Sequence, residues 1–515
     1  MNEPEKALRT EGTAKPAHST AVIYVIDRRE RLLVPLTFGF CLLLVNTLLT
    51  CGSGLGWASA VCAWYALVAI CKGRRLTATT ESRFLLGTNL ALALVSLALG
   101  SNGFFRGWNT LALMALLPIH AIGLSGGQFL PWWRPAMLWE RLCLLLTGFF
   151  GRLGAVIAAL LPREPGGSRR ALPLAAGTAG AVVLLAVLVP VLASADALFA
   201  AATADLRDFF TLHFTDAVWK AILAGVMTPF FFGLLYFLRQ PTPLRRKEGP
   251  SRGGADSLAF AIVLAAAAAL YLLFLGVQSA GLLGGAEYLA RKHISYAEWA
   301  RSGFFQMVGV TALNLTLLLA AVQWSRRQGA AWRAVRLLSA LLTAESLVLL
   351  ASAAVRMTLY VEAYGLSFKR CMTYWGMGMM AAFLLAAAWK VRRPDFRFCR
   401  VAFPLALAGW LAINCVPVDY LVAKDQVDRY LAGESAALDA GYLLYDLSYD
   451  TLSQLERLDP TLVEYDRPDL VVYDRNGYPA FLSVEIEARR AEAREDCADW
   501  RTWSLSAWLA ARGGA

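Results

Sequence analysis

The chain has 515 residues, of which 57% are hydrophobic and only 17% charged, against about 25% charged in an average globular protein. The formal net charge is +11, but residues 418–515 carry 19 acidic and 10 basic side chains, so the remainder carries +20. This excess lies in short loops beside long apolar runs. Such a distribution excludes a basic nucleic-acid-binding face and indicates membrane topology signals. The apolar runs lack a continuous polar face, which excludes a large soluble helical protein.

The apolar runs predict a polytopic all-α membrane helical bundle with about eleven transmembrane helices. A bilayer core requires about 20 apolar residues per helix. We expect a cytoplasmic N-terminal tail over residues 1–30, a transmembrane domain over 31–417 and a small soluble α+β domain over 418–515. The predicted spans are residues 32–50, 55–71, 84–100, 108–125, 171–193, 218–238, 257–284, 303–324, 337–354, 372–389 and 401–417.

The flanking charges predict the orientation of these spans. If the N-terminus is cytoplasmic, the inside loops hold 26 Lys and Arg residues, whereas those in or beside the outside loops hold nine. This bias is the one that the positive-inside rule expects. Eleven crossings then place the C-terminal domain outside the cytoplasmic membrane.

Residues 144–162 are long enough to span but are predicted not to cross. Arg152 lies near the middle of the segment, and a central Arg costs about 2.5–3.5 kcal/mol on insertion scales. The loops before and after the segment are both basic, so a crossing would invert the charge bias of every later loop. We therefore expect a re-entrant or interfacial helix on the cytoplasmic side.

The C-terminal domain shows mixed patterns. Helical periodicity runs across Val422 to Leu458, and the stretch Leu470 to Ile486 is typical of a β-hairpin because a tight-turn sequence at 474–477 separates two apolar runs. A second helix is expected to end near Ala511. An interfacial helix is expected at 194–217, and the outer elements 194–217, 285–302 and 355–371 are expected to pack against this domain.

Signatures of catalysis and metal binding are few. The nine cysteines are scattered without C-x-x-C pairs, and the four histidines are dispersed, so we predict no catalytic residue, cofactor or metal. Residues 123–127 match G-x-S-x-G, but at the end of a membrane helix, where a flexible helix terminus is the simpler interpretation. His120 lies within a span and is expected to form a hydrogen bond between helices.

Glu345 is the acidic residue that lies deep inside a predicted span. Ionisable groups at that depth usually face a bundle interior, a cavity or a charged partner. Two interpretations stay open: proton or cation coupling, or a structural network with a partner such as Arg152. Polar side chains elsewhere in the spans, at Asn46, Asn89, Asn314 and Asn414, are most simply interhelical hydrogen-bonding groups.

The stretch 356–370 between two predicted spans is the most distinctive. If it is helical, Arg356, Tyr360 and Tyr364 share one face, and the Gly-Leu-Ser that follows suits a helix stop and a turn. One interpretation is an interfacial anchor with Tyr and Arg at headgroup level. The other is a site that binds an anionic group on the outer face, together with Arg370.

Several motifs resemble those of a membrane family of unknown function. Arg356-x-x-x-Tyr360 with Tyr364-Gly365-Leu366-Ser367 and Arg370 resembles R-x-x-L-Y-x-x-x-Y-G-L-T-x-x-R of the bacterial 4173 group of domains of unknown function, which is akin to the 4153 group. Further resemblances lie at 194–199 (S-A-D-P-x-F), 296–304 (Y-A-E-Y-x-R-x-G-F), 422–430 (I-A-R-x-N-V-x-R-Y), which includes Asp428 and Arg429, and 499–506 (D-W-R-S-W-N-L-S), which includes Trp500, Arg501 and Trp503.

This resemblance covers about residues 190–506 and implies an integral membrane protein of the bacterial cytoplasmic (inner) membrane without a known activity. The chain departs from the family at Ser367, at Gln426 and at 417–419, where Pro-Val-Asp stands in place of Asn-Pro-Asp. The first functional hypothesis is a non-enzymatic component for envelope sensing, assembly or partner binding, with membrane lipids and envelope or membrane proteins as partners. The alternative is a transporter or lipid-handling protein that uses Glu345. The sequence does not give the oligomeric state.

Overall fold

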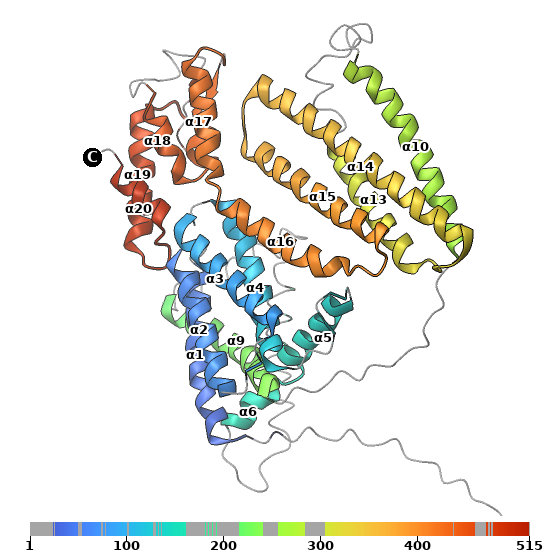
Figure 1. Cartoon of the computed structure of the whole chain (residues 1–515). Coiled ribbons are helices and arrows are strands. Elements are labelled where there is room, and N and C mark those ends of the chain that lie inside the picture. The colour runs from blue at the N-terminus through green and yellow to red at the C-terminus, as the bar shows by residue number, and fades with distance from the viewer. Residues whose placement is uncertain are drawn as a thin grey trace, which may run out of the picture.

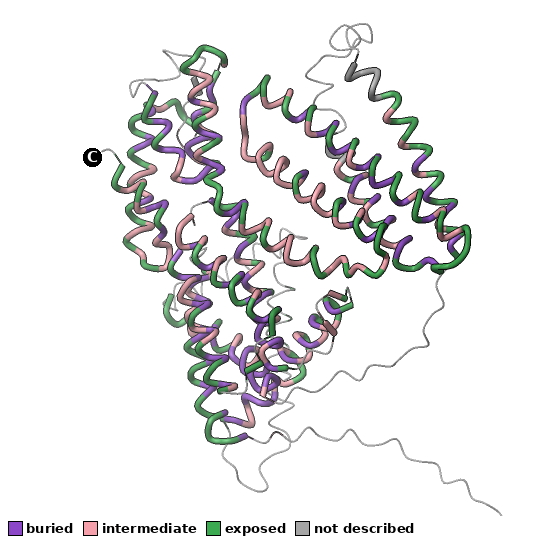
Figure 2. The backbone as a smooth tube through the Cα atoms, in the orientation of Figure 1, coloured by how far each residue is buried: buried purple, intermediate pink, exposed green. Residues whose placement is uncertain are grey.

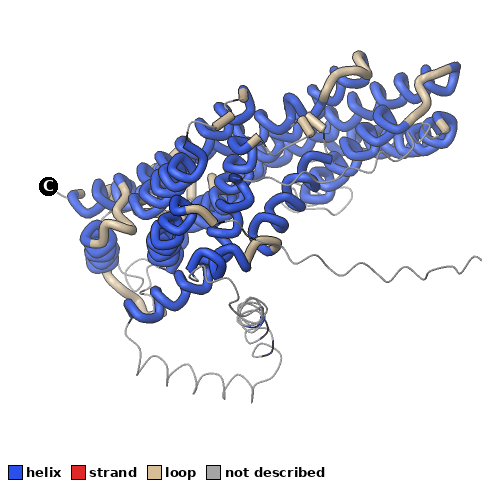
Figure 3. The backbone as a smooth tube through the Cα atoms, turned by 90° about the horizontal axis from the view of Figure 1, so that it is seen from below, coloured by secondary structure: helices blue, strands red, loops and turns tan. Residues whose placement is uncertain are grey.

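A computed structural model of the chain describes residues 24–160, 216–239, 256–283, 304–458 and 470–513, with short gaps inside the first and the last two ranges, and four single residues between 181 and 192. The described chain is almost entirely helical (Figures 1 and 3). The predicted span 171–193 and the predicted outer elements 194–217 and 285–302 lie essentially outside the described residues.

The helices form two bundles. The N-terminal bundle contains α1 (Arg28–Leu49), α2 (Leu55–Lys72), α3 (Thr80–Leu99), α4 (Gly103–Ser125), α5 (Ala136–Phe150), α6 (Gly154–Leu160) and α9 (Asp216–Arg239). The rings of Phe40, Trp64 and Phe231 pack together in its core, with centroids 5.3–5.8 Å apart. Such contacts give close aromatic packing between α1, α2 and α9.

The second bundle contains α10 (Ser257–Leu283), α13 (Phe304–Trp324), α14 (Gly329–Tyr364) and α15 (Phe368–Arg392). At 36 residues, α14 is about 54 Å long, well beyond a hydrocarbon core of about 30 Å. Helix α16 (Phe398–Asn414) lies between the two bundles (Figure 1). It leads into α17 (Val418–Leu431) through a bend of 48°.

Nine helices of the described residues are long and apolar enough to cross a membrane, or ten if the bent pair α16–α17 counts as one span. Eight of the nine coincide with predicted spans. The ninth is the segment Ala136–Leu160. The predicted span at 303–324 corresponds to α13 (Phe304–Trp324), of which Val308–Trp324 counts as a shorter apolar helix among the described residues. The chain is therefore a helical membrane protein, as its composition indicates.

The hydrogen bonds between helix ends define two ends of the molecule. At what we call the basic end, Lys72 of α2 donates to the carbonyl of Leu238 at the end of α9 over 2.9 Å, and Ser257 at the start of α10 donates to Arg326 after α13 over 2.6 Å. At the opposite end, which we call the docking end, the residues after α16 contact the turns of both bundles. The described parts of the loops predicted to be cytoplasmic, such as Trp133–Arg134, Arg327 and Asp395, thus lie at the basic end.

The segment predicted to be re-entrant is a broken helix beside α9. Helix α5 ends at Phe150 and α6 begins at Gly154. The backbone of Arg152 contacts Gly233 of α9, near the basic end, and Leu160 shares an apolar cavity with Gly225 and Pro229, near the middle of α9. The segment therefore enters from the basic end and reaches about half the length of α9 by its last described residue. Its failure to cross stays a prediction.

The C-terminal region, residues 418–513, is mostly helical. It contains α17, a π-helical turn at Tyr442–Asp446 (η2), a 3-10 turn at Tyr449–Thr451 (η3), α18 (Leu452–Leu455), α19 (Leu482–Ala498) and α20 (Leu505–Arg512). Its strands are β1 (Leu438–Asp439) and β2 (Leu470–Val471), which pair in parallel with Leu438 opposite Leu470. Its apolar core is continuous with membrane helices, because Phe105 of α4 and Ile413 of α16 belong to the same buried cluster.

The predicted hairpin at 470–486 is wrong in its second half. The tight turn is present: the amide of Asp474 donates to Tyr478 over 2.8 Å, and Gly477 has a φ of +82°. Leu482 and Ile486, however, belong to α19. The residues that follow are rich in Glu, Ala and Arg, which favour helix, and Leu482, Glu485, Ile486 and Ala493 are buried on one helical face.

Candidate functional site

The turn between α14 and α15 carries the most distinctive sequence motif. Gly365 ends α14 with a φ of +72°, a conformation that glycine adopts most readily. Ser367 caps α15 by accepting from the amide of Arg370. The Arg370 guanidinium donates to the carbonyls of Tyr364, over 3.0 Å, and of Gly365. It lies 4.3 Å from the centre of the Tyr360 ring, so Arg370 closes the end of α14 and stacks on its last turn.

Helix α17 of the C-terminal region holds this turn. The carboxylate of Asp425 accepts from the amide of Leu366 over 2.6 Å, and Gln426 donates to the carbonyl of Leu366 over 2.5 Å. Arg429 donates to the carbonyl of Glu362 over 2.6 Å. A Cβ at Gly365 would lie 2.9 Å from the Gln426 amide nitrogen and 3.0 Å from the Asp425 carboxylate. The sequence motifs at 356–370 and 422–430 are therefore in direct contact.

A second contact joins the C-terminal region to the N-terminal bundle. The first amides of α2, those of Leu55 and Gly56, donate to the carbonyls of Trp503 and Arg501, each over 3.1 Å. Amides in the first turn of a helix have no partner within the helix, and here the C-terminal region supplies one. A Cβ at Gly54 would collide with the carbonyl of Trp503, so glycine permits this close approach.

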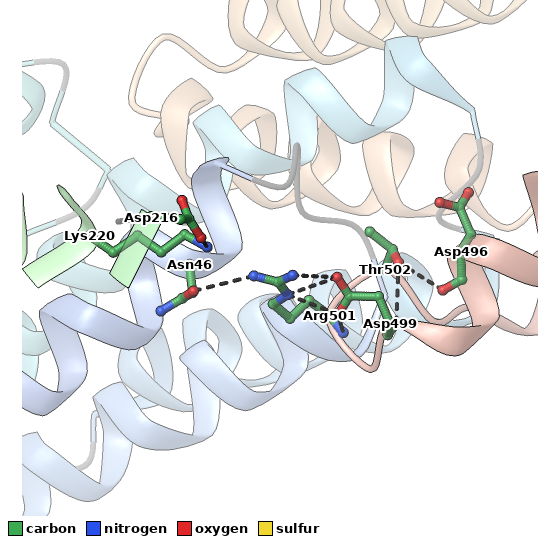
Figure 4. A network of polar contacts seen from close by, with 7 residues as sticks. All are labelled: Asn46, Asp216, Lys220, Asp496, Asp499, Arg501 and Thr502. Carbon is green, nitrogen blue, oxygen red and sulfur yellow. Dashed lines mark hydrogen bonds and ion pairs between the residues drawn. The ribbon is translucent and has the colours of Figure 1, made fainter. Parts of the chain in front are cut away.

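Arg501 is the centre of a polar network at this contact (Figure 4). Its guanidinium donates to both carboxylate oxygens of Asp499, over 2.6–2.9 Å, and to the side-chain oxygen of Asn46 on α1 over 3.3 Å. The hydrogen bonds with Arg501 lower the pKa of Asp499. A surface hollow of about 680 Å³ opens here, with half-exposed Trp500 at its rim. Lys220 and Asp216 of α9 form an ion pair beside it.

Asp419 forms a third contact, which the sequence did not single out. Asn102, the N-cap of α4, donates to the Asp419 carboxylate over 2.6 Å, and the amide of Ser448 donates to it over 3.0 Å. Asp419 is 3% exposed. The sequence feature that could have pointed to Asp419 is its position as an acidic residue in the first turn of a helix, where backbone amides lack partners within the helix. The residue occupies the position of the aspartate in the Asn-Pro-Asp pattern of the resemblance.

The remaining predicted site residues do not form one site, because they lie in different parts of the molecule. Asp428 pairs with Arg457 over 2.6 Å inside the C-terminal region. Arg356 is buried in α14 rather than presented at the surface, whereas Tyr360 and Tyr364 are neighbours with ring centroids 4.9 Å apart. Since Arg370 is engaged by carbonyls and rings, the stretch 356–370 supports an architectural role better than an open anion site.

Glu345 lies in the second bundle, 3% exposed, and neither of its carboxylate oxygens has a hydrogen-bond partner among the described residues. The amide of Asn314 on α13 donates to the hydroxyl of neighbouring Ser346 over 3.0 Å. Arg152, which the sequence suggests as a partner of Glu345, instead lies against α9 in the other bundle. The structure therefore does not bring the proposed pair together.

Several other buried polar side chains are joined between helices, as expected. His120 of α4 lies 2.7 Å from the hydroxyl of Tyr65 on α2 and 2.9 Å from that of Ser82 on α3. Asn89 donates to Tyr65 over 2.8 Å, and Asn109 donates to Asn414 over 2.7 Å. Asn46 donates to the carbonyl of Leu42 in its own helix and accepts from Arg501 after α19. Within the described ranges, no group of three or more His, Cys, Asp or Glu side chains is placed to hold a metal.

The family of the chain follows from the extent of one match. The sequence profile of a domain of unknown function (DUF4153) matches residues 87–458, which is more than half of the chain. The chain belongs to the DUF4153 family. The DUF4153 unit runs from α3 to α18, so it includes the α14–α15 turn, α17 and Asp419, whereas the α1–α2 turn and the Arg501 network lie outside it. No curated protein and no solved structure matches the chain.

Proposed function

We propose that this DUF4153 protein is a non-enzymatic membrane component for envelope sensing, assembly or partner binding. The observation that carries the proposal is the docking of the C-terminal region at three places on two bundles: the α1–α2 turn, the start of α4 and the α14–α15 turn. A partner that binds the C-terminal region therefore acts on both bundles at once. The half-exposed Trp500 beside the Arg501 network is the surface we assign to that partner.

We further propose that the protein resides in the cytoplasmic membrane of a bacterium, with the C-terminal region outside, and that its motifs are those of the 4173 group. The excess of Lys and Arg at the basic end supports this orientation. Single cysteines at Glu487, which is exposed in α19, and at Gln328, which is exposed at the basic end, test it in a cysteine-free background. A membrane-impermeant maleimide should label the first in intact cells and the second only after permeabilisation. The reverse pattern contradicts the orientation.

Weakening the docking tests the function. Asp425→Ala and Gly365→Val should loosen the contact between α17 and the α14–α15 turn while the helices still insert, since Gly365 caps the end of α14 and Asp425 lies on α17, after the last apolar helix. We expect a changed envelope phenotype and loss of partners captured through a photo-crosslinker at Trp500. Lys424→Ala, the neighbouring exposed residue on α17, is the matched control. An envelope phenotype and a crosslinking pattern that match the wild type in both docking variants would count against the proposal.

Glu345 favours a second candidate function, a coupled transporter or lipid-handling protein. A buried carboxylate without a hydrogen-bond partner among the described residues is unusual in a span and commonly marks a site that binds a proton or cation. In proteoliposomes, a solute flux or lipid exchange that disappears in Glu345→Gln would support this candidate. Equal activity in wild type and variant would remove its basis.

A further inference from the structure

A cavity at the basic end lies between the two bundles and is rich in cationic side chains. Its volume is about 560 Å³. Trp133 and Arg134, between α4 and α5, form one wall, and the ends of α13 and α15 with the start of α16 form the others. The cavity is separate from the docking contacts, and its role does not depend on the proposed function.

The charges lining this cavity are unbalanced. Four cationic side chains line it, those of Arg134, Arg327, Lys390 and Arg397, and one carboxylate, that of Asp395. Asp395 is engaged by Arg327 over 2.7 Å. In the part of the chain that the structure describes, Arg134, Lys390 and Arg397 have no carboxylate within ion-pair distance. The lining therefore carries a net charge of +3, and three of its cations form no ion pair among the described residues.

Two of the lining cations, Lys390 and Arg397, are held in place by the protein. Lys390 is 6% exposed, and its ammonium donates to the carbonyl of Phe396 over 3.0 Å and more weakly to that of Pro394. The guanidinium of Arg397 lies 4.6 Å from the centre of the Trp133 ring, and that of Arg400 lies 5.7 Å from it. A buried ammonium and stacked guanidinium groups form a preorganised anion site rather than a set of mobile surface charges.

The same cavity has an apolar side. Leu319 and Ala320 of α13, together with Trp324 and Phe398, continue its wall toward the membrane interior. Because a cationic rim joins an apolar wall at the end of the spans, the site matches an amphiphile whose anionic head lies at headgroup level. A free phosphate ion would use only the rim.

We propose that this cavity binds an anionic phospholipid, with the headgroup phosphate among Arg134, Lys390 and Arg397 and an acyl chain along α13. A lipid bound there contacts Trp133 and Arg134 of the N-terminal bundle and the helices of the second bundle at once. It therefore joins the two bundles at the basic end, opposite the joint that the C-terminal region makes at the docking end.

Thermal unfolding of the full chain in a neutral detergent, with added lipid, tests the proposal. Phosphatidylglycerol should raise the melting temperature in a saturable manner, whereas phosphatidylcholine should not. In Arg134→Gln/Arg397→Gln the apparent affinity for phosphatidylglycerol should fall about tenfold or more, since each surface cation contributes appreciably to binding an anionic lipid. Arg393→Gln, in the same loop but outside the cavity lining, should keep the wild-type affinity.

Two further measurements distinguish lipid binding from misfolding and from the binding of a soluble phosphate compound. Arg134→Lys/Arg397→Lys preserves the charge but loses the stacking on Trp133, so it should retain more of the lipid response than the Gln variant, which separates charge recognition from misfolding. Soluble glycerol phosphate should give no comparable shift. An undiminished response to phosphatidylglycerol in the Gln variant, an equal response to phosphatidylcholine, or an equal response to glycerol phosphate would each overturn the proposal.

Discussion

The two bundles differ in whether their buried polar side chains have hydrogen-bond or ion-pair partners. In the N-terminal bundle, Glu81 and Arg141 form a buried ion pair and His120 links three helices. In the second bundle, Glu345 is equally buried but has no hydrogen-bond partner among the described residues. Figure 2 also shows exposed residues along most of α10, whose Leu273 and Val277 are about two-thirds exposed. The N-terminal bundle is therefore a packed core, and the second bundle presents more of its apolar surface to lipid.

The largest expected effect is the loss of the buried ion pair. Arg141 is 1% exposed and pairs with Glu81. Arg141→Leu leaves the carboxylate buried without its partner, so we expect a loss of about 3–5 kcal/mol in the free energy of unfolding. Thermal or chemical unfolding in detergent measures it. The double variant Glu81→Leu/Arg141→Leu should recover most of the loss, and a double variant no more stable than the single would contradict this account.

Glu345 is expected to behave in the opposite way. Glu345→Leu removes a buried carboxylate that gains no hydrogen bond, so stability should rise by about 1–2 kcal/mol. The same unfolding assay compares it with Arg141→Leu. Destabilisation by Glu345→Leu would show that the carboxylate makes a stabilising interaction and would weaken its interpretation as an ion site.

A single hydroxyl sharpens the comparison further. The hydroxyl of Tyr65 forms hydrogen bonds with both His120 and Asn89. Tyr65→Phe should therefore lower the free energy of unfolding by about 1 kcal/mol. Tyr374→Phe in the second bundle removes an exposed hydrogen bond to Thr358 and should cost less than about 0.5 kcal/mol. If the two variants lose equal stability in the same unfolding assay, the polar network of the N-terminal bundle does not contribute as proposed.

The smallest expected effect is a pH dependence at the docking end. Arg501 lowers the pKa of Asp499 below its ordinary value of 3.8. A carboxylate with a depressed folded pKa stabilises the folded state above the unfolded pKa and loses this contribution as the pH falls through the folded pKa. Docking of the C-terminal region should therefore weaken below about pH 4, by less than about 1 kcal/mol because both side chains are partly exposed.

Protection of the amides of Leu55 and Gly56 from hydrogen exchange measures this docking. Asp499→Asn should abolish the pH-dependent part of this amide protection. Glu487→Gln, which alters a carboxylate whose pKa Arg494 lowers away from the contact, is the matched control. An unchanged pH profile in Asp499→Asn would exclude the Asp499–Arg501 pair as its source.

The sequence by itself determined the class of the protein and most of its helices. Hydrophobic length is a local property, so runs such as 55–71 and 257–284 located α2 and α10 within a few residues. The expectation that His120 bonds between helices was also local, because a polar group in a span must find a partner.

Only the tertiary structure decided which of these groups meet. Leu366 and Asp425 are about 60 residues apart in the chain, Gly54 meets Trp503 across almost the whole sequence, and no periodicity encodes either pairing. The site of Asp419 and the cationic cavity were equally invisible, because each is assembled from several elements. The hairpin prediction failed for the same reason: burial of Leu482 and Ile486 on one helical face, rather than the turn before them, determined the structure.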